Sequence, residues 1–125
     1  DLGHEVWRTE IDQDGGPVLK LNFRIPGIKQ AILDNAMMRG LLLPAALRPV
    51  LEEIAHNPPI DEDDEADWKR DWLRFCTDQL DSDPEDIDRT DEEGAENWIR
   101  SAIETFCQDN GFVEAIVASM KEEIS

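Results

Sequence analysis

The stretch from Asp61 to Glu96 most constrains what this chain can fold into, because it is acidic from end to end. Residues 61–67 read DEDDEAD and hold six carboxylates. Residues 78–96 add ten more, against a single arginine. Charge of this density opposes burial, so both runs are expected at the surface. Between the two runs lies the segment from Trp68 to Cys76, part of one amphipathic helix with two tryptophans.

The charge of the chain is concentrated in its second half. The formal net charge is −18. Residues 1–57 contain six basic and eight acidic residues, whereas residues 58–125 contain six basic and 22 acidic residues. A negative field of this strength repels nucleic acid and anionic membranes, and it attracts basic protein surfaces. We therefore expect no direct nucleic-acid binding and no membrane association.

Length and composition indicate one small folded domain. A chain of 125 residues is long enough to close a hydrophobic core. Apolar residues make up 40% of it and include four Trp and four Phe, which separates it from disordered acidic sequences. No internal repeat and no long Gly/Ser or Pro-rich linker divides it. We expect a single acidic domain over residues 1–125.

The first 25 residues predict a β-hairpin over residues 5–25. Glu5 to Asp12 alternates between apolar and polar side chains, and Val18 to Ile25 alternates again. Between them, Asp14 to Pro17 has the Gly and Pro residues of a tight turn. An isolated hairpin is marginally stable in water, so its apolar face is expected to lie on helices or on another chain.

Helical periodicity dominates the rest of the chain. Apolar residues recur at helical spacing over residues 27–39, where Gly40 is expected to end the helix, and over residues 44–56. The apolar run Leu41 to Leu43 is expected to be a buried connection. Met37 and Met38 are expected in the core.

Three further helices are predicted in the acidic half, over residues 62–80, 91–108 and 112–123. The first has one apolar stripe opposite a face expected to carry Lys69, Arg70, Asp71 and Arg74. The second is expected to open with a capping box between Thr90 and Glu93, and to end at Asn110-Gly111. The third is expected to direct the following residues inward: Phe112, Val113, Ile116, Val117, Met120 and Ile124. The fold class is therefore α+β and mostly α: an N-terminal β-hairpin packed on a bundle of about five α-helices.

The sequence contains no recognisable catalytic motif. A nucleophile needs a base beside it, and the two histidines, His4 and His56, lie near the N-terminus and at a helix end. Cys76 and Cys107 fall on apolar faces and are expected to be free thiols in the core. We expect a protein that is not an enzyme and that uses no cofactor.

Metal binding is not expected either. The segment from Asp81 begins like a calcium loop, but its sixth position, where the sharp turn needs Gly, is Asp86. Two histidines and two cysteines without close spacing do not make a zinc site. The acidic residues are therefore better candidates for contact with another protein.

We hypothesise that the protein is an acidic interaction protein that binds a basic protein surface. Carboxylates one helical turn apart are roughly 5–6 Å from each other, which is of the same order as phosphate spacing along a nucleic-acid strand, about 3.4 Å. The partner could therefore be a nucleic-acid-binding enzyme, blocked by an inhibitor that imitates nucleic-acid charge, of the anti-restriction, anti-defence or nuclease-immunity type. The candidate contact residues are Asp61, Glu62, Asp63, Asp64, Glu65, Asp67, Asp81, Asp83, Glu85, Asp86, Asp88, Asp91, Glu92 and Glu93.

The alternative hypothesis is a structural or assembly subunit, or a chaperone, that binds its partner through apolar surface and the hairpin. The sequence leaves a homodimer open. It also leaves open whether Trp68 and Trp72 lie in the core or in an interface, although aromatic stripes on helices usually face inward. The first ten residues contain no apolar run and no stretch approaches the roughly 20 apolar residues of a membrane span. We therefore expect a cytoplasmic protein.

Overall fold

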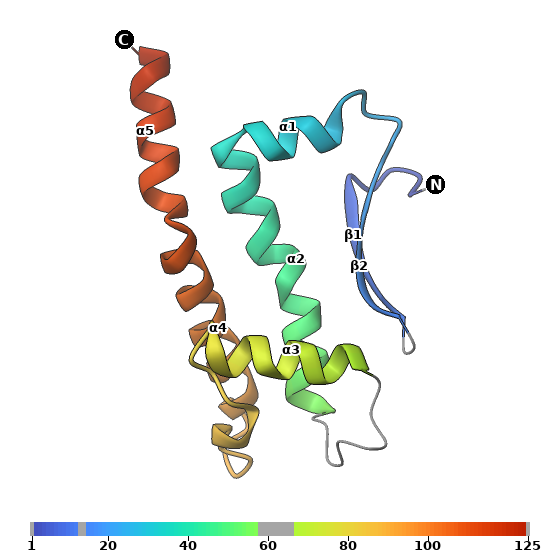
Figure 1. The fold of residues 1–125 in the computed structure, drawn as a ribbon, viewed down its shortest axis with the longest axis vertical. Helices are drawn as coiled ribbons and strands as arrows, with labels where there is room; N and C mark the ends of the chain where they lie inside the picture. The colour runs from blue at the N-terminus through green and yellow to red at the C-terminus, as the bar shows by residue number, and fades with distance from the viewer. Residues whose placement is uncertain (1, 13–14, 58–66, 125) are drawn as a thin grey trace.

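The structure is a computed structural model that describes residues 2–12, 15–57 and 67–124, with the side chains of residue 67 and residues 122–124 left aside. It confirms the α+β class, with an antiparallel hairpin followed by helices (Figure 1). The described elements are β1 (Trp7–Asp12), β2 (Gly16–Leu21), α1 (Ile28–Asp34), α2 (Ala36–His56), α3 (Asp67–Asp78), the short 3₁₀ helix η1 (Pro84–Asp86), α4 (Gly94–Asn110) and α5 (Phe112–Ile124).

The hairpin has the register that its alternation predicts. Trp7 lies opposite Leu21 and Thr9 lies opposite Leu19, so these side chains share one face. The Thr9 hydroxyl donates a hydrogen bond to the carbonyl oxygen of Ala46 in α2, at 2.9 Å. The inner face of the hairpin therefore rests on α2, as an otherwise marginal two-stranded sheet requires.

Both strands are shorter than the predicted hairpin. β2 ends at Leu21, and the Asn22 side chain then folds the chain back by donating to the carbonyls of Gly3 and Glu5 and accepting from the Arg24 amide. Phe23, expected on the inner face, is 86% exposed. In the sequence, apolar and polar residues go on alternating beyond Leu21. The strand nevertheless ends there, because the hydrogen bonds of the buried Asn22 side chain turn the chain.

The boundary between the first two helices lies at Asn35 and not at Gly40, so the expected break at Gly40 is wrong. The Asn35 side chain accepts a hydrogen bond from the Met38 amide at 3.0 Å and caps α2. α2 then continues through Gly40, where a Cβ would approach Ile116 Cδ1 to 2.8 Å and Phe112 Cβ to 3.3 Å. The absence of a side chain at Gly40 therefore allows α5 to pack closely against α2. Leu41–Leu43, expected to form a connection between helices, is part of α2.

α3 places the predicted aromatic stripe inward. Trp68 is 8% exposed and Cys76 is 0% exposed, and Trp72 packs against the same core from the side. Lys69, expected on the outer face, is instead buried, with its ammonium 3.6 Å from Glu53 Oε1 in α2. The predicted start of this helix at residue 62 lies outside the described residues.

The core consists of two clusters of buried side chains. The larger joins α2, α3 and α4 at the end of the molecule where α3 crosses the bundle (Figure 1): Leu47, Leu51, Ile54, Ala55, Trp68, Cys76, Leu80, Ile87, Trp98, Ile99 and Ala102. The smaller lies under the hairpin and α1: Ile28, Ile32, Leu42 and Ala46. The first cluster, therefore, supports the acidic half of the sequence.

The last helix is covered on only one side. Gly111, with a φ of 60°, ends α4 as predicted, and α5 continues away from the acidic end, antiparallel to α2 (Figure 1). Phe112 is buried and meets Phe106 edge to face, with ring centroids 5.7 Å apart. The expected inward position of Val113, Val117 and Met120 is wrong, because these side chains are 69%, 45% and 48% exposed.

Candidate protein-interaction surface

The acidic segment 81–93 connects α3 to α4 and forms one end of the molecule, opposite α1 and the C-terminal end of α5 (Figure 1). It contains eight of the predicted contact residues. Asp83 is half-buried, and the side chains of the other seven are exposed: Asp81, Glu85, Asp86, Asp88, Asp91, Glu92 and Glu93. These eight carboxylates lie within 13 consecutive residues, and seven of their side chains are exposed.

The backbone of the acidic segment is held by buried side chains at regular intervals. Leu80, Ser82, Pro84 and Ile87 are all buried, and the first of these is 1% exposed. The Trp98 indole Nε1 of α4 donates a hydrogen bond to the Asp83 carbonyl oxygen at 3.1 Å. The segment is therefore fixed to the larger core cluster while its carboxylates face outward.

Gly94 brings the end of the acidic segment against its middle. A Cβ at Gly94 would lie 2.1 Å from the Asp88 carbonyl oxygen, closer than any side chain can approach. The first turn of α4 can therefore pack directly on the backbone at Asp88. Any residue larger than glycine would separate the two.

Three aspartates of the segment also shape its backbone. Asp83 Oδ1 accepts from the Glu85 amide, and Asp91 Oδ1 accepts from the Glu93 amide, both at 2.9 Å. Asp88 Oδ1 accepts from the Thr90 amide at 2.9 Å and from the Thr90 hydroxyl at 2.5 Å. The Thr90 hydroxyl, followed by its amide, lowers the pKa of the Asp88 carboxyl below its usual value.

These turns replace the predicted capping box. Thr90 was expected to cap a helix starting at residue 91, but its hydroxyl donates to Asp88, and α4 begins at Gly94 without a side-chain cap. Aspartate side chains compete well for nearby backbone amides, which delays the start of the helix. Asp83 caps the short 3₁₀ helix η1, with Pro84 in its first turn.

The segment borders a shallow, open hollow of about 360 Å³ between η1 and the first turns of α4. Five of its lining residues are aspartates: Asp81, Asp83, Asp86, Asp88 and Asp91. Trp98 and Ile87 are also part of its lining. Within the described parts of the chain, no three His, Cys, Asp or Glu residues are placed to hold a metal ion.

The other predicted contact residues cannot be placed. Residues 61–66 lie outside the described residues, and Asp67 begins α3 with a side chain that is not described. The prediction for Asp61, Glu62, Asp63, Asp64, Glu65 and Asp67 stays a prediction.

An ion-pair network borders the acidic segment and was not anticipated from the sequence. The Arg48 guanidinium of α2 bonds to Glu52 at 3.1 Å and to Glu96 of α4, and Arg100 approaches Glu96 at 3.8 Å. The hydrogen bond from Arg48 lowers the pKa of the Glu96 carboxyl. Glu96 is thus neutralised by its neighbours, whereas in the described parts of the chain no Lys or Arg forms an ion pair with the carboxylates of residues 81–93.

The cysteines are free thiols, as predicted, but only one is fully buried. Burial raises the pKa of the Cys76 thiol to about 11, which keeps it protonated at neutral pH. Cys107 is half-buried, and burial raises the pKa of its thiol as well. Neither thiol has the lowered pKa of a nucleophilic cysteine.

No helix in the described part of the chain combines the length and apolarity that crossing a lipid bilayer requires. No family model, no curated protein and no solved structure matches this chain. The acidic segment 81–93 is consequently interpreted from its own geometry alone.

Proposed function

We propose that this chain is a non-enzymatic interaction protein whose acidic segment 81–93 binds a basic surface on a partner protein. The observation that carries the proposal is the combination of eight clustered carboxylates with a backbone fixed by buried side chains and by Trp98. Solvated acids that only prevent aggregation need no such anchoring. A rigid charged surface loses little conformational entropy on binding, which favours affinity.

The chemistry of the hollow suggests what the partner contributes. Five aspartates around a space of about 360 Å³ suit a lysine ammonium or an arginine guanidinium, and the flanking Trp98 and Ile87 suit the aliphatic stem of such a side chain. A partner with several such side chains would be a nucleic-acid-binding protein, whose cleft already accepts closely spaced negative charges. The most concrete form of the proposal is an inhibitor that occupies this cleft in place of DNA or RNA.

The test is capture of partners from a host lysate at two salt concentrations, with a charge-reversed variant. The variant carries Glu85→Lys, Asp86→Lys and Glu92→Lys, three exposed side chains that accept no hydrogen bond in the segment. We expect the native protein to retain basic proteins at about 0.1 M salt and to release them at about 1 M, where the Debye length has fallen from about 10 Å to about 3 Å. The variant should retain none of them.

A matched control separates the acidic segment from total charge. Glu104→Lys, Asp109→Lys and Glu114→Lys change the net charge by the same amount on exposed positions of α4 and α5. This control should keep most of the binding. Equal loss in both variants would contradict a defined acidic site, and release of the partner by added duplex DNA would support the nucleic-acid form of the proposal.

A second candidate, an assembly subunit or chaperone, is favoured by one observation at the hairpin. Phe23 is 86% exposed and lines an open hollow of about 730 Å³ together with Leu2, Leu19, Leu21 and the cations Lys20, Arg24 and Lys29. Binding through this surface would be nearly insensitive to the Glu85, Asp86 and Glu92 reversal. A partner that stays bound to the reversed variant at high salt would favour this candidate.

A further inference from the structure

The outer edge of β2 carries main-chain groups that point away from β1. Asn22 lies opposite Val6, and its amide donates a hydrogen bond to the Val6 carbonyl oxygen at 2.9 Å. In an antiparallel ladder, hydrogen-bonded pairs alternate with pairs that are not hydrogen-bonded. Leu21 lies one position from Asn22 and Leu19 lies three positions from it, so both belong to pairs of the second kind. The N–H and C=O groups of Leu19 and Leu21 therefore face outward from the hairpin.

Pro17 agrees with this assignment of the outer edge. It lies in β2 two residues before Leu19, so its ring nitrogen also faces away from β1. A proline within a strand is tolerated where its nitrogen, which carries no hydrogen, faces away from the partner strand. The sheet has two strands, and no third strand in the described part of the chain covers this edge. An edge of this kind is a template for pairing with an extended segment of another chain.

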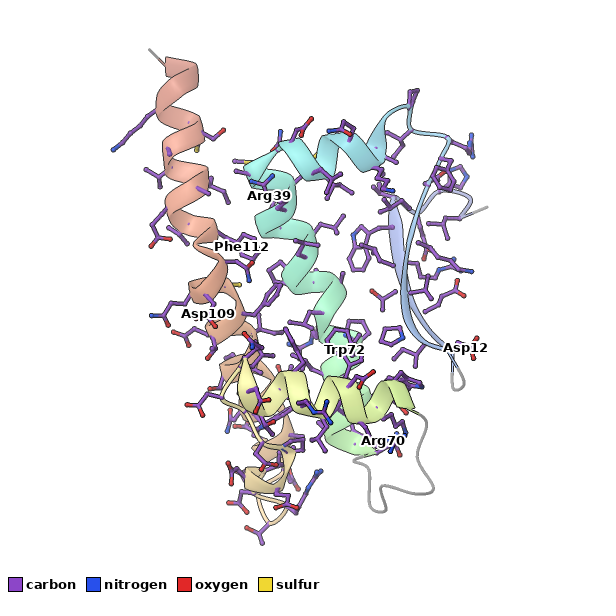
Figure 2. The ribbon with its side chains drawn as sticks, in the orientation of Figure 1. Asp12, Arg39, Arg70, Trp72, Asp109 and Phe112 are labelled. Carbon is purple, nitrogen blue, oxygen red and sulfur yellow. The ribbon has the colours of Figure 1, made fainter. Side chains whose placement is uncertain are left out.

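The open hollow of about 730 Å³ at the hairpin runs along the same edge. Leu19 and Leu21 line it from the inner face of β2, and Lys20 lines it from the outer face. None of the six residues of β1, all of which are described, lines it. The hairpin is on the side of the molecule away from α5 (Figure 1), and Asp12, labelled in Figure 2, marks the end at which it turns. A space that touches both faces of β2 and no residue of β1 lies at the outer edge of β2.

The side chains at this edge are positively charged, although the chain as a whole is strongly acidic. Residues 15–33 contain no acidic residue and three basic residues, which all line the hollow: Lys20, Arg24 and Lys29. Lys20 pairs with Glu10 at 3.1 Å. Arg24 and Lys29 are exposed and form no ion pair within the described part of the chain. The hollow therefore offers uncompensated positive charge to a negatively charged ligand.

The combination of main-chain groups and cations selects the kind of ligand. Leu19 and Leu21 each present one donor and one acceptor at the spacing of a strand, and a polypeptide main chain supplies the matching pattern. Phosphate groups supply acceptors only. A second copy paired along the same edge would place like charges opposite each other, which is destabilising. The acidic segment 81–93 of another copy does not suit the edge either, because its backbone is fixed to the core and is not extended.

We propose that the outer edge of β2 binds an extended acidic segment of a partner protein by strand addition. The main chain of the partner pairs with Leu19 and Leu21. Side chains of an added strand alternate between the two faces of the sheet. One set lies beside Lys20 on the outer face, and the other set lies beside Leu19 and Leu21 on the inner face. The partner segment is therefore expected to alternate acidic and apolar residues.

This inference rests on the second candidate function, an assembly subunit or chaperone, and gives it a mode of binding and a partner chemistry. It is independent of the acidic segment 81–93, which lies at the other end of the molecule (Figure 1). The net charge of −18 repels an acidic partner at long range. At about 0.1 M salt this repulsion is screened beyond about 10 Å, so the local cations decide the contact.

Fluorescence anisotropy with a labelled synthetic peptide tests the proposal on the full chain. The peptide alternates glutamate and valine over about eight residues, the length of an ordinary strand. A matched peptide has glutamine in place of every glutamate. We expect the glutamate peptide to bind at least about fivefold more tightly at about 0.1 M salt, because only its side chains are charged. Equal affinity of the two peptides, or no binding of the glutamate peptide, would overturn the proposal.

N-methylated forms of the glutamate peptide test the main-chain pairing. In an extended strand, the N–H groups of alternate residues point to opposite edges. Methyl groups on the valine amides therefore block one edge of the peptide, and methyl groups on the glutamate amides block the other. We expect one of the two methylated peptides to lose at least about tenfold in affinity, and the other to bind like the parent. Equal affinities of the two methylated peptides would show that binding is not strand addition.

Charge reversal in the protein tests whether the local cations decide the contact. Arg24→Glu with Lys29→Glu should weaken binding of the glutamate peptide about tenfold. The matched control, Arg74→Glu with Lys121→Glu, makes the same change in net charge at exposed positions of α3 and α5, and should stay within about twofold of the native chain. Phe23→Ala, at a side chain that is 86% exposed, should weaken binding several-fold without altering the circular dichroism spectrum. Equal loss in the two double variants would contradict a local site.

Two further results separate this proposal from the other interactions of the chain. The variant with Glu85→Lys, Asp86→Lys and Glu92→Lys should bind the glutamate peptide at least as tightly as the native chain, even though it no longer retains basic proteins. Failure of the peptide to bind would leave the acidic-segment proposal untouched. Self-association that blocks the peptide and is abolished by Phe23→Ala would assign the edge to a second copy and overturn the proposal.

Discussion

The two ends of this molecule combine charge and packing in opposite ways. The acidic end contains the larger core cluster, and its best-buried side chains are less than 2% exposed: Leu51, Ile54, Leu80, Ile99 and Cys76. The end formed by α1, the start of α2 and the C-terminal part of α5 is nearly neutral. It has the smaller cluster, whose four members are 3% to 9% exposed, and it exposes large apolar side chains of α2 and α5: Met37, Leu41, Val113, Val117 and Met120.

The difference shows where this chain uses its apolar side chains. Like charges close together destabilise a compact state, so the acidic segment 81–93 can stay ordered only above a core that offsets this repulsion. The neutral end has no such repulsion to offset, and its remaining apolar side chains are left at the surface. One end is thus suited to contacts by charge and the other to contacts by apolar packing.

The largest expected effect is on the free energy of unfolding, when one leucine of each core cluster is replaced by alanine. Leu51→Ala, at a position 0% exposed in the larger cluster, should reduce the free energy of unfolding by about 3–5 kcal/mol. Leu42→Ala, at a position 7% exposed in the smaller cluster, should cost about 2–3 kcal/mol, because the cavity is nearer the surface. Urea denaturation followed by tryptophan fluorescence measures both values, and an equal or larger cost at Leu42 would contradict the comparison.

The features that the sequence predicts correctly depend on short-range patterns. The hairpin follows from alternation on both sides of a Gly-rich turn, and the stripe of α3 follows from its apolar spacing. The stop at Gly111 follows from local backbone chemistry. In each case the residues that decide the structure are neighbours along the chain.

The errors arise where the deciding contact is distant along the chain. Gly40 breaks no helix because α5, about 75 residues further on, packs against it. Val117 belongs to an apolar stripe that is wider than the surface available to cover it, so periodicity could not show that it is exposed. In the candidate site, the sequence identified the acidic residues but not the hydrogen bond from Trp98 to the Asp83 carbonyl oxygen. The helical spacing of Trp98 predicts only that its side chain is buried.

A second prediction concerns the order of the acidic end, and it should have an intermediate effect. Gly94→Ala places a Cβ against the Asp88 carbonyl, so we expect a loss of about 1–3 kcal/mol, the usual cost of overpacking. The matched control is Gly15→Ala in the hairpin turn, where a Cβ would meet only the Asp12 side chain, at 3.5 Å. Thermal unfolding should show little change in the control.

Gly94→Ala should also weaken the capture of basic proteins, because it displaces the backbone that positions the carboxylates. Its net charge is unchanged. A variant that is destabilised yet binds with full affinity would show that the order of the acidic segment is not needed for binding, and charge alone would then explain the interaction.

The smallest expected effect tests whether the core beneath the acidic segment excludes water. The Cys76 thiol has a pKa raised by burial from 9.0 to about 11, so the folded state keeps its proton at a pH where the unfolded state has lost it. The unfolded state therefore binds fewer protons, and stability falls as pH rises from about 9 towards 11, by about 1 kcal/mol at pH 10. Urea unfolding at pH 8 and pH 10 measures this change, with Cys76→Ala as the comparison. Cys76→Ala should lose less stability over the same pH interval. An identical loss in both proteins would mean that the Cys76 thiol is hydrated. The acidic end would then be less tightly packed than its buried residues indicate.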